Sequence, residues 1–431
     1  MTPAEQSFAA QLEQGGHRAD PAFVRALRQG GRDCFLRVKL PTSKHEDWRF
    51  TSLAALGARS FLPAPARSST AGQQAAPRLV FQNGRLDLGA SDLSGLPAGA
   101  RVGSLATALR ERPEVVEHLL GQVGTPLHDH AFVALNAGLF EDGALVEIED
   151  GVTCERPINL VFCSQPVGPT PIASHPRNLL VVGRGARAVV VEHYCGEGNY
   201  LVNAVTEVAL GEAARLEHDR LQEDGREGFH VGILSVEQAA GSRFVGQSLA
   251  LGAMLARVEG RVLLGGEEAT CELNGLYLAG GTQVRDHFVH VDHARPCCVS
   301  REVFKGILDG ASRGVFTGRV HVREGARKTD AGQVNSNLIL SEDATIDTRP
   351  QLEILNDDVK CWHGGAVGQI GEEQLFYLRS RGLSEPMARA LLAWAFASEM
   401  VERVGPMELR ALLKRAVTAR LPHGALLREV A

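Results

Sequence analysis

The feature that most constrains the fold is a turn signal that recurs at a nearly constant spacing through the middle of the chain. At each recurrence a turn pair is followed by a small residue and then by alternating apolar and polar residues. The middle residues of the five triplets are Ala186, Ala213, Ser242, Ala269 and Ala326. They are 27, 29, 27 and 57 residues apart, and the last interval equals two periods. A period in this range, made of strands alone, predicts stacked coils that each bury an apolar face against the next.

A pattern of short strand-like runs separated by turn residues continues from about residue 131 to residue 370. Short β-branched runs such as Val315–Val322 and Gln333–Leu340 are cut by Gly, Asp and Asn. No helical crossover lies between these runs, which excludes a doubly wound sheet. The predicted fold class is therefore mainly β, with a parallel β-helix as its core. A β-sandwich, whose turns also recur, is the alternative that the near-constant period disfavours.

Both ends of the chain have helical signals. Near the start, Asp20-Pro21 caps a short helix that is expected to stop at Gly30-Gly31, and Ser384-Glu385-Pro386 caps a longer helix near the end. A Pro-, Ser- and Ala-rich stretch with little apolar content separates the first helices from the strands and reads as a linker. The predicted divisions are an N-terminal helical region, a linker, a mixed connecting segment, the β-helix and a C-terminal helical domain, at 1–62, 63–78, 79–130, 131–370 and 371–431.

Composition and charge indicate which kinds of partner and which cellular compartment to expect. The formal net charge is −6 and the pI is about 6.2, with no basic stripe, so nucleic acid is not expected as a partner. No stretch is apolar for long enough to cross a bilayer, and the first residues lack the pattern of a signal peptide. Eight scattered cysteines in 431 residues do not make a disulfide framework. We therefore expect a cytoplasmic protein without a membrane partner.

Two segments resemble nucleotide-binding loops but lack what those loops need. Gly183–Ala188 nearly spells a dinucleotide fingerprint, but Val189-Val190-Val191 follows where a helix must begin. Lys328-Thr329 resembles the end of a phosphate loop, but Arg327 and Val322 stand where that loop requires glycine. The chain is therefore not expected to hydrolyse nucleotide by itself.

Two other segments carry metal-ligating residue types. In Asp286–His293, strand alternation places residues 287, 289, 291 and 293 on one face, so its three histidines do not converge. Asp–His pairs along a β-helix face are favoured over a metal site there. Farther on, Cys361 and His363 share a face if the segment is extended, and both residue types bind iron. Two ligands cannot close a four-coordinate site, so others must come from elsewhere in the chain or from a second subunit; a buried structural cysteine is the alternative.

A longer likeness connects these residues. The run FKGILDGASRGVFTGRVHV, then GARKTDAGQVNSNLILSEDATIDTRPQLEILNDDVKCWHG and LFYLRSRGL, resembles the SufB/SufD family of iron–sulfur cluster assembly proteins from about Asp286 to Val404. The N-terminal KHEDWRFTSL also resembles that family. The likeness is to the SufD branch, because Trp362 and Gly364-Gly365-Ala366 stand where the SufB pattern has other residues. Trp362 also departs from the small residue that is common in SufD relatives.

The resemblance implies a fold and a set of partners. The implied fold is a right-handed parallel β-helix flanked by helical domains. The implied complex contains SufB and two copies of the ATPase SufC, which supplies the phosphate loop that this chain lacks. By the same resemblance, His363 helps to hold a nascent Fe–S cluster at the SufB interface, beside Cys361. No catalytic residue is implied, and no cluster is expected to stay on the isolated chain.

The C-terminal helices are the expected SufC-binding part. Their clustered apolar residues suggest a docking surface for the ATPase, formed by Leu391, Trp394 and Phe396.

Three functions remain open at this level. A scaffold subunit for cluster assembly is favoured. A β-helix carbohydrate-active enzyme is the rival of a different class, and it would expose an acidic cleft. A purely structural partner that positions two ATPases is the third, and it differs only in having no functional His363. A homodimer is also possible when SufB is absent.

Overall fold

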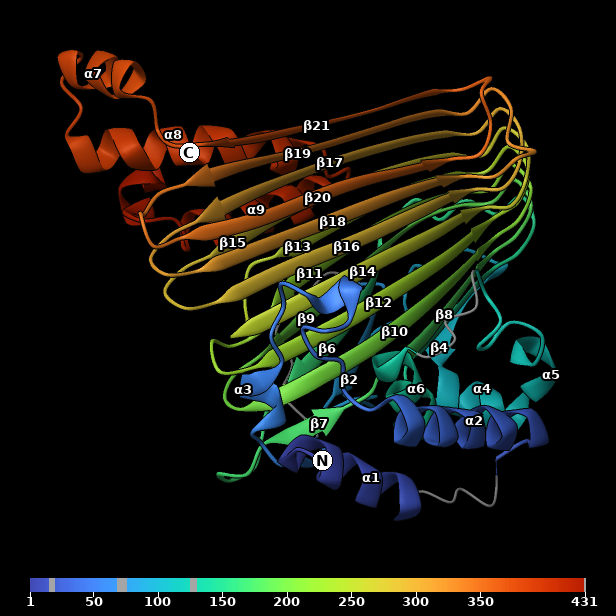
Figure 1. Ribbon diagram of the computed structural model, residues 1–431. Helices are drawn as coiled ribbons and strands as arrows, with labels where there is room; N and C mark the ends of the chain where they lie inside the picture. The colour runs from blue at the N-terminus through green and yellow to red at the C-terminus, as the bar shows by residue number, and fades with distance from the viewer. Residues whose placement is uncertain (15–19, 68–75, 125–129, 430–431) are drawn as a thin grey trace.

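Successive strands of the central region alternate between two parallel sheets, so each strand pairs with the strand two places along the chain (Figure 1). This computed structural model describes residues 1–14, 20–67, 76–124 and 130–429. Sheet A contains β8, β10, β12, β14, β16, β18 and β20, at Arg177–Val182, Tyr200–Leu210, Phe229–Gln238, Leu255–Leu264, Val284–His293, Arg313–Val322 and Thr345–Ile354. Sheet B contains β6, β9, β11, β13, β15, β17, β19 and β21, at Ile158–Ser164, Arg187–Gly196, Arg215–Glu223, Arg243–Ala250, Thr270–Ala279, Val299–Leu308, Asp330–Ile339 and Lys360–Gly368. The core is thus the parallel β-helix that the repeat predicts, and not a β-sandwich.

Additional strands extend both sheets at the N-terminal end. Sheet A continues through β5 (Ala144–Ile148) to an antiparallel β4 (Ala100–Ser104), and sheet B continues through β2 (Arg78–Gln82) to β3 (Arg85–Leu86). Two further short strands lie at this end: β7 (Ile172–Ser174) pairs with β10, and β1 (Leu62–Pro63) pairs with β7. The β-sheets therefore begin well before residue 131, because part of the predicted connecting segment supplies their first strands. Of the predicted linker, residues 68–75 lie outside the described residues, and its first residue, Pro63, belongs to β1.

The recurring turn signal forms one corner of the β-helix. Strand register sets the coil lengths: Arg187 aligns with Arg215, Arg243, Thr270, Val299 and Asp330, at intervals of 28, 28, 27, 29 and 31 residues. At each corner a residue with positive φ precedes a small buried residue. The positive-φ residues are Gly185, Ala213, Gly241, Glu268, Cys297 and Lys328, and the buried residues are Ala186, Ala214, Ser242, Ala269, Cys298 and Thr329. The double interval in the sequence pattern allowed for a coil between Ala269 and Ala326, but the pattern did not identify its corner at Cys297-Cys298. The pattern also placed the second corner one residue early and the last corner three residues early.

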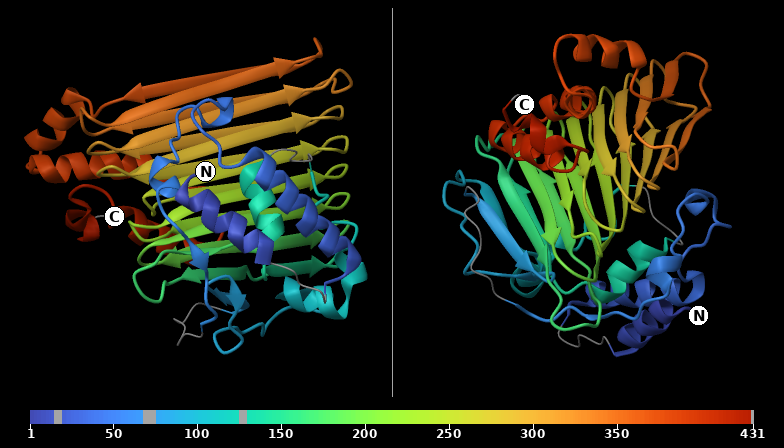
Figure 2. Two further views of the ribbon diagram at one scale, coloured as in Figure 1. Left: turned by 60° about the horizontal axis from the view of Figure 1, so that its bottom comes forward. Right: turned by 90° about the vertical axis from the view of Figure 1, so that its left-hand side faces the viewer.

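Helices cover the outer faces of both sheets (Figure 2). The N-terminal helices pack on sheet A; they are α1 (Pro3–Gln14), α2 (Ala22–Val38), the 3₁₀ turn η1 (Glu46–Trp48), α3 (Ala54–Gly57) and α6 (Ala131–Leu139), with α4 (Leu105–Glu111) and α5 (Pro113–Val116) beside them. The C-terminal helices pack on sheet B; they are α7 (Glu372–Ser380), α8 (Glu385–Glu402), α9 (Met407–Thr418) and η2 (Gly424–Glu429). Central strands are therefore buried on both faces, as the burial of nearly every residue of β12 shows.

Ala131–Leu139 corrects the predicted start of the strand region. Its sequence, AFVALNAGL, is apolar on nearly every side and forms α6, which lies between α2 and sheet A. A short apolar run of this kind carries no period that separates a buried helix from a buried strand. Here tertiary packing selects the helix.

Gly30-Gly31 does not end the first predicted helix, because α2 continues through both residues to Val38. Gly31 lies against α6: a Cβ there would stand 2.6 Å from the carbonyl oxygen of Ala134. Gly30 has no neighbour within 4 Å of such a Cβ. Close helix packing, and not helix termination, therefore explains Gly31.

These two adjacent glycines give a matched test of the packing. Gly31→Ala is expected to lower the free energy of unfolding by about 1–3 kcal/mol, because the methyl group would overlap backbone atoms of α6. Gly30→Ala is expected to raise it by up to about 1 kcal/mol, because alanine favours the helix and meets nothing. Denaturant unfolding of both variants measures the difference. Equal effects of the same sign would contradict this account of the α2–α6 contact.

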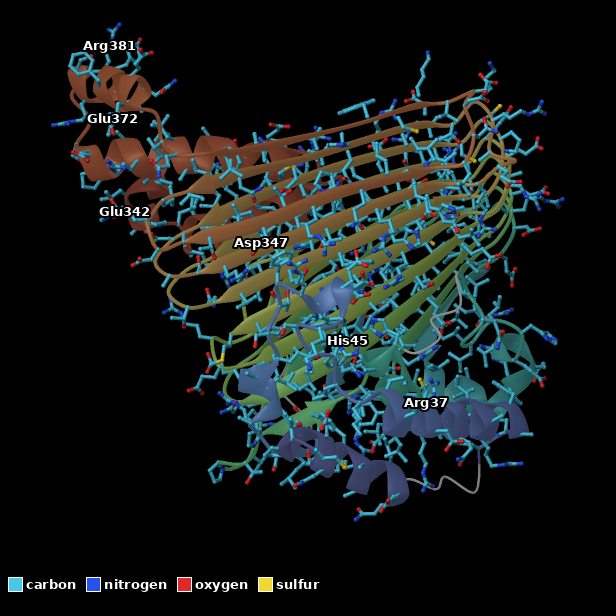
Figure 3. The ribbon with its side chains drawn as sticks, in the orientation of Figure 1. Arg37, His45, Glu342, Asp347, Glu372 and Arg381 are labelled. Carbon is cyan, nitrogen blue, oxygen red and sulfur yellow. The ribbon has the colours of Figure 1, made fainter. Side chains whose placement is uncertain are left out.

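The KHEDWRFTSL segment lies across the outer face of sheet A. Trp48 is buried against Phe132, with the guanidinium of Arg257 4.0 Å from its ring centroid. Asp47 bonds Arg319 on β18 at 3.2 Å, and Glu46 bonds Arg349 on β20 at 3.1 Å. Figure 3 shows the labelled His45 in this segment, over the sheet. The segment thus fixes the N-terminal region to the last coils of the β-helix.

Candidate functional site

The β-helix ends in two strands whose outer edges are free of any other described strand. β20 is the last strand of sheet A and β21 the last strand of sheet B, and each pairs on one side only. Both lie at the end of the β-helix opposite α1 and β7 (Figure 1). Their residues are mostly exposed or half-buried, whereas those of the central strands are mostly buried. An unpaired edge of this length offers backbone donors and acceptors to another strand.

The predicted ligand pair lies on this terminal strand. Cys361 aligns with Ala331 and His363 with Gln333, both of which are buried inside the β-helix. Strand alternation therefore places Cys361 and His363 on the same face, as predicted. This is the inner side of β21, where no further described coil covers them. His363 is exposed. Cys361 is half-buried and packs against a small apolar cluster that contains Val320 and Ala331; burial raises the pKa of its thiol.

Trp362 lies between them on the outer side. Its side chain is 48% exposed and its ring covers Gly332, where an added Cβ would stand 2.5 Å from the indole. Gly332 therefore provides the room that this large side chain needs. The ring lies on the opposite side of β21 from His363, so Trp362 does not cover the imidazole.

A buried amide and a buried carboxyl lie beneath His363. Gln333 donates from Nε2 to Oε2 of Glu302 at 2.6 Å, and Glu302 is 1% exposed. Burial raises the pKa of Glu302 to about 8, against a smaller lowering by the Gln333 hydrogen bond. Close to neutral pH, this carboxyl is therefore protonated in a large share of molecules.

The pair is too small to hold a metal ion alone. Within the described parts of the chain, no group of three or more His, Cys, Asp and Glu side chains is placed to bind one. A thiol and an imidazole are both good ligands for iron, but a tetrahedral iron needs further ligands. Any metal held here must therefore share ligands with another molecule.

The Asp286–His293 segment forms β16, and its face assignment is confirmed. His287 points into the β-helix, where burial lowers its pKa to about 3, and its Nε2 lies 3.0 Å from the Ser248 hydroxyl. His293 likewise faces inward and contacts Ser300 at 2.9 Å. The expected Asp–His pairing along a β-helix face is found for one of the two aspartates: Asp292 contacts His321 of the neighbouring strand β18 at 3.4 Å and also bonds Arg323. Asp286 instead bonds Arg257 and Thr51.

Both nucleotide-like segments lie at corners followed by strands. Gly183–Ala188 connects β8 to β9, and Lys328-Thr329 precedes β19. Neither corner opens a helix, so neither presents the helix N-terminus that binds a pyrophosphate or triphosphate. The strand predicted at Val189-Val190-Val191 is confirmed, since these residues belong to β9.

The predicted docking residues all lie on α8. Leu391, Trp394 and Phe396 are half-buried and pack partly against the apolar cluster between the C-terminal helices and sheet B. Lys305 lies 4.6 Å from the centroid of the Phe396 ring and bonds Glu399 at 2.5 Å. These contacts leave only part of each side chain available to a partner.

The sequence analysis missed two more exposed aromatic residues on α7. Phe376 is 75% exposed and Tyr377 is 56% exposed. Their helix projects beyond the end of the β-helix, where Figure 3 labels Glu372 and Arg381. Adjacent residues on a helix point about 100° apart, so a single buried face cannot cover both. That spacing is the signal that could have identified them.

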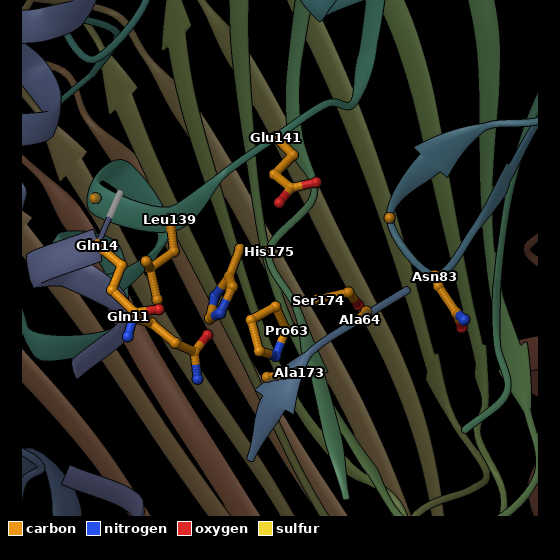
Figure 4. Close-up of a pocket in the computed structure, with 12 residues that line it drawn as sticks. Gln11, Gln14, Pro63, Ala64, Asn83, Leu139, Glu141, Ala173, Ser174 and His175 are labelled. Atoms are coloured by element: carbon orange, nitrogen blue, oxygen red, sulfur yellow. The ribbon is translucent and has the colours of Figure 1, made fainter. Parts of the chain in front are cut away.

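The N-terminal end contains a cavity that sequence reasoning did not find. It has a volume of about 210 Å³ and is lined by residues of α1, β1 and β7, including Gln11, Pro63, Ser174 and His175 (Figure 4). Burial lowers the pKa of His175 to about 3, so this imidazole is neutral. The cavity lies at the opposite end of the β-helix from β21, so it belongs to a different region than the Cys361–His363 pair.

None of the helices that the structure describes is both long enough and apolar enough to span a membrane.

Comparison with known proteins places the whole chain in one family. Residues 166–396 match the model of the SUF system FeS cluster assembly SufBD core domain, and residues 74–160 match that of the SufBD protein N-terminal region. An iron–sulfur cluster assembly SufBD family protein of Synechocystis is 33% identical over 91% of this chain and 90% of the relative. The iron–sulfur cluster assembly protein SufD of Escherichia coli is 30% identical over 98% of both chains. The chain therefore belongs to the SufBD family of SUF-system iron–sulfur cluster assembly proteins, as a SufD-like member.

Proposed function

We propose that this chain is a non-catalytic scaffold subunit of a cytoplasmic SUF complex. In this proposal it pairs with SufB through the open end of the β-helix, contacts the ATPase SufC through its C-terminal helices, and helps to build and transfer a nascent iron–sulfur cluster. The observation that carries the proposal is the placement of Cys361 and His363 on the last strand, beside an unpaired edge.

The open edges support pairing with a second β-helix. Strands β20 and β21 present unpaired backbone groups side by side at one end of the molecule. A related β-helix could continue both sheets there by strand addition, which gives affinity through main-chain hydrogen bonds. Because SufB belongs to the same family, its terminal coil is the expected partner. A second copy of this chain is the alternative when SufB is absent.

The ligand set supports a shared cluster. A cluster iron bound by His363 lacks the remaining ligands within the described chain, and SufB can supply them across the junction. The cluster is the cargo of the complex, because it is built and then transferred. The half-buried thiol of Cys361 is the second candidate ligand, and its raised pKa makes it a poorer ligand until iron displaces the proton.

The C-terminal helices support contact with the ATPase. We extend the docking surface on α8 to include α7, so that it contains Phe376, Tyr377, Leu391, Trp394 and Phe396. Exposed aromatic residues of this kind are enriched among interface residues that dominate binding energy. The rival function, a purely structural partner for two ATPases, uses the same surface and differs only in the role of His363.

Affinity capture of this chain from cells that also express SufB and SufC tests the proposed complex. The wild-type chain is expected to retain both partners. Phe376→Ala and Trp394→Ala are expected to weaken SufC binding by about tenfold or more while retaining SufB, because the truncated rings belong to α7 and α8 and not to the edge strands β20 and β21. Leu88→Ala is the matched control, because Leu88 is 77% exposed and lies at the N-terminal end.

The same capture experiment has clear contrary outcomes. Retention of SufC by every variant on α7 and α8 would place the ATPase contact elsewhere. Recovery of neither SufB nor SufC with the wild-type chain would overturn the proposed complex itself. Circular dichroism of each variant checks that the β-helix remains folded.

A further inference from the structure

Two cysteine thiols meet on the outer face of sheet B, far from the open end. Cys163 on β6 and Cys195 on β9 are in register on neighbouring parallel strands, and their Sγ atoms lie 2.8 Å apart. Both residues are free cysteines that are partly exposed, whereas Cys154, Cys271 and Cys298 are buried. The proposed function assigns no role to this pair.

The strand geometry is compatible with a covalent bond between the two thiols. Neighbouring parallel strands lie about 4.8 Å apart, which falls within the range of about 4.4–6.8 Å that disulfides span between Cα atoms. Because the residues are directly in register, the two Cβ atoms leave the sheet on the same side. Closing the bond therefore requires movement of the sulfur atoms and little movement of the backbone.

The neighbours of the two thiols make them chemically unequal. Across four strands, the outward-facing row runs Gln82, Cys163, Cys195, Glu223. Either thiol can be the donor in the contact between the two sulfur atoms. The contact with Cys195 lowers the pKa of Cys163, and a hydrogen bond from Gln82 lowers it further. Cys195 is half-buried and lies beside the Glu223 carboxylate; the contact with Cys163 and burial raise its pKa, and Glu223 raises it further. The arrangement favours Cys163 as the nucleophile and Cys195 as the thiol that attacks second.

We propose that Cys163 and Cys195 form a redox-active dithiol that exchanges with low-molecular-weight disulfides to give a cross-strand disulfide. The thiolate of Cys163 attacks one sulfur of the reagent, whose S–S bond breaks and releases one thiol. Cys195 then loses its proton and attacks the Cys163 sulfur of the mixed disulfide. The second thiol leaves, and the Cys163–Cys195 bond forms. Two electrons pass from the protein to the reagent, which is reduced to two thiols.

Oxidised glutathione, applied to the full-length reduced protein, tests this proposal. After acid quenching, the mass of the intact protein is expected to be lower by two hydrogen atoms. After alkylation and digestion, peptide mass spectrometry is expected to find Cys163 joined to Cys195. Of the eight cysteines, the two in the disulfide then no longer react with the alkylating reagent. The disulfide closes a segment of 32 positions, so the oxidised protein is expected to unfold at a higher temperature than the reduced protein.

Single-cysteine variants distinguish the proposed order of attack from unspecific oxidation. Cys195→Ser is expected to stop at a glutathione adduct on Cys163, because no second thiol can resolve it. Cys163→Ser is expected to leave Cys195 unmodified at the same glutathione concentration. Cys297→Ser is the control and should still form the cross-link, because Cys297 is an exposed cysteine on a corner far from this pair.

Two results would overturn the proposal. One is a wild-type protein in which Cys163 and Cys195 both stay alkylated at every ratio of oxidised to reduced glutathione. The other is a glutathione adduct on Cys195 in Cys163→Ser together with no adduct on Cys163 in Cys195→Ser. The wild-type measurement needs no substitution, so a variant that fails to fold does not remove the test. Co-purification with SufB and SufC is unaffected by either result, so the proposed function stands or falls separately.

Discussion

A complex that carries His363→Ala is expected to assemble normally and to lose nearly all of its iron–sulfur cluster. His363 is exposed at the end of the β-helix, so its removal leaves no buried cavity and little change in stability is expected. Its removal leaves Cys361 as the one remaining proposed iron ligand on β21. Loss of a ligand is expected to lower cluster occupancy on the order of tenfold or more.

Three measurements on the same preparation check the His363 result. Thermal unfolding tests the fold, affinity capture tests association with SufB and SufC, and iron and sulfide analysis tests the cargo. His118→Ala is the matched control, because His118 is also exposed but lies at the N-terminal end. Cys361→Ala is expected to have a milder effect if its thiol only packs against the small apolar cluster around Ala331. If His363 were a structural residue, its loss would instead destabilise the fold.

The second large effect is expected from Arg257, which holds the N-terminal segment on sheet A. Its guanidinium bonds Glu259 at 2.8 Å and also bonds Asp286, and it lies over the ring of Trp48. Glu259, Asp286 and Trp48 are all buried. Arg257→Ala would leave two carboxylates in a dry environment without this cation, so we expect a loss of about 3–5 kcal/mol in the free energy of unfolding.

A surface ion pair provides the control for Arg257. Arg243 bonds Glu272 at 2.6 Å, but their side chains are 53% and 39% exposed. Arg243→Ala is therefore expected to change stability by less than about 1 kcal/mol. Urea unfolding compares the two variants, and limited proteolysis reports whether the segment around Trp48 detaches in Arg257→Ala. Similar losses from both substitutions would contradict the role given to burial.

The coil period was predictable from the sequence because each corner is formed by residues that are close together in the chain and favour a turn. At each corner, a residue in the left-handed region of φ is followed by a small buried residue. Such a corner can be recognised in the sequence when these residues are Gly, Ala or Ser. The corner at Cys297-Cys298 has the same geometry, but its residues are not typical turn residues, so the sequence indicated this coil only through the doubled interval. The C-terminal helices were also predictable, since α8 begins at Glu385 after Ser384, beside Pro386.

Features that depend on long-range packing were not predictable from local pattern. Ala131–Leu139 is helical because α2 and sheet A enclose it, and Gly31 is required by the same contact. The meeting of Cys163 with Cys195 depends on a coil of 32 residues, longer than the regular period, which hid their alignment. Bonds of Asp286 to Arg257 and Thr51 join segments far apart in sequence.

The candidate site was predictable in part. Alternation along an extended strand was enough to place Cys361 and His363 on one side of β21. That β21 has a free edge could not be inferred, because a local pattern does not say whether another strand will follow. The buried pair formed by Gln333 and Glu302 beneath His363 depends on the register of three strands, which only the structure gives.

In the proposed function, the cluster site at β21 is complete only when SufB is present. The most direct test is the iron and sulfide content of this chain purified alone and purified with SufB and SufC, after the same anaerobic reconstitution. Little or no cluster is expected on the isolated chain. A loaded cluster is expected in the complex, and His363→Ala is expected to abolish it. A full cluster on the isolated chain, or an unchanged cluster in a folded His363→Ala complex, would contradict it.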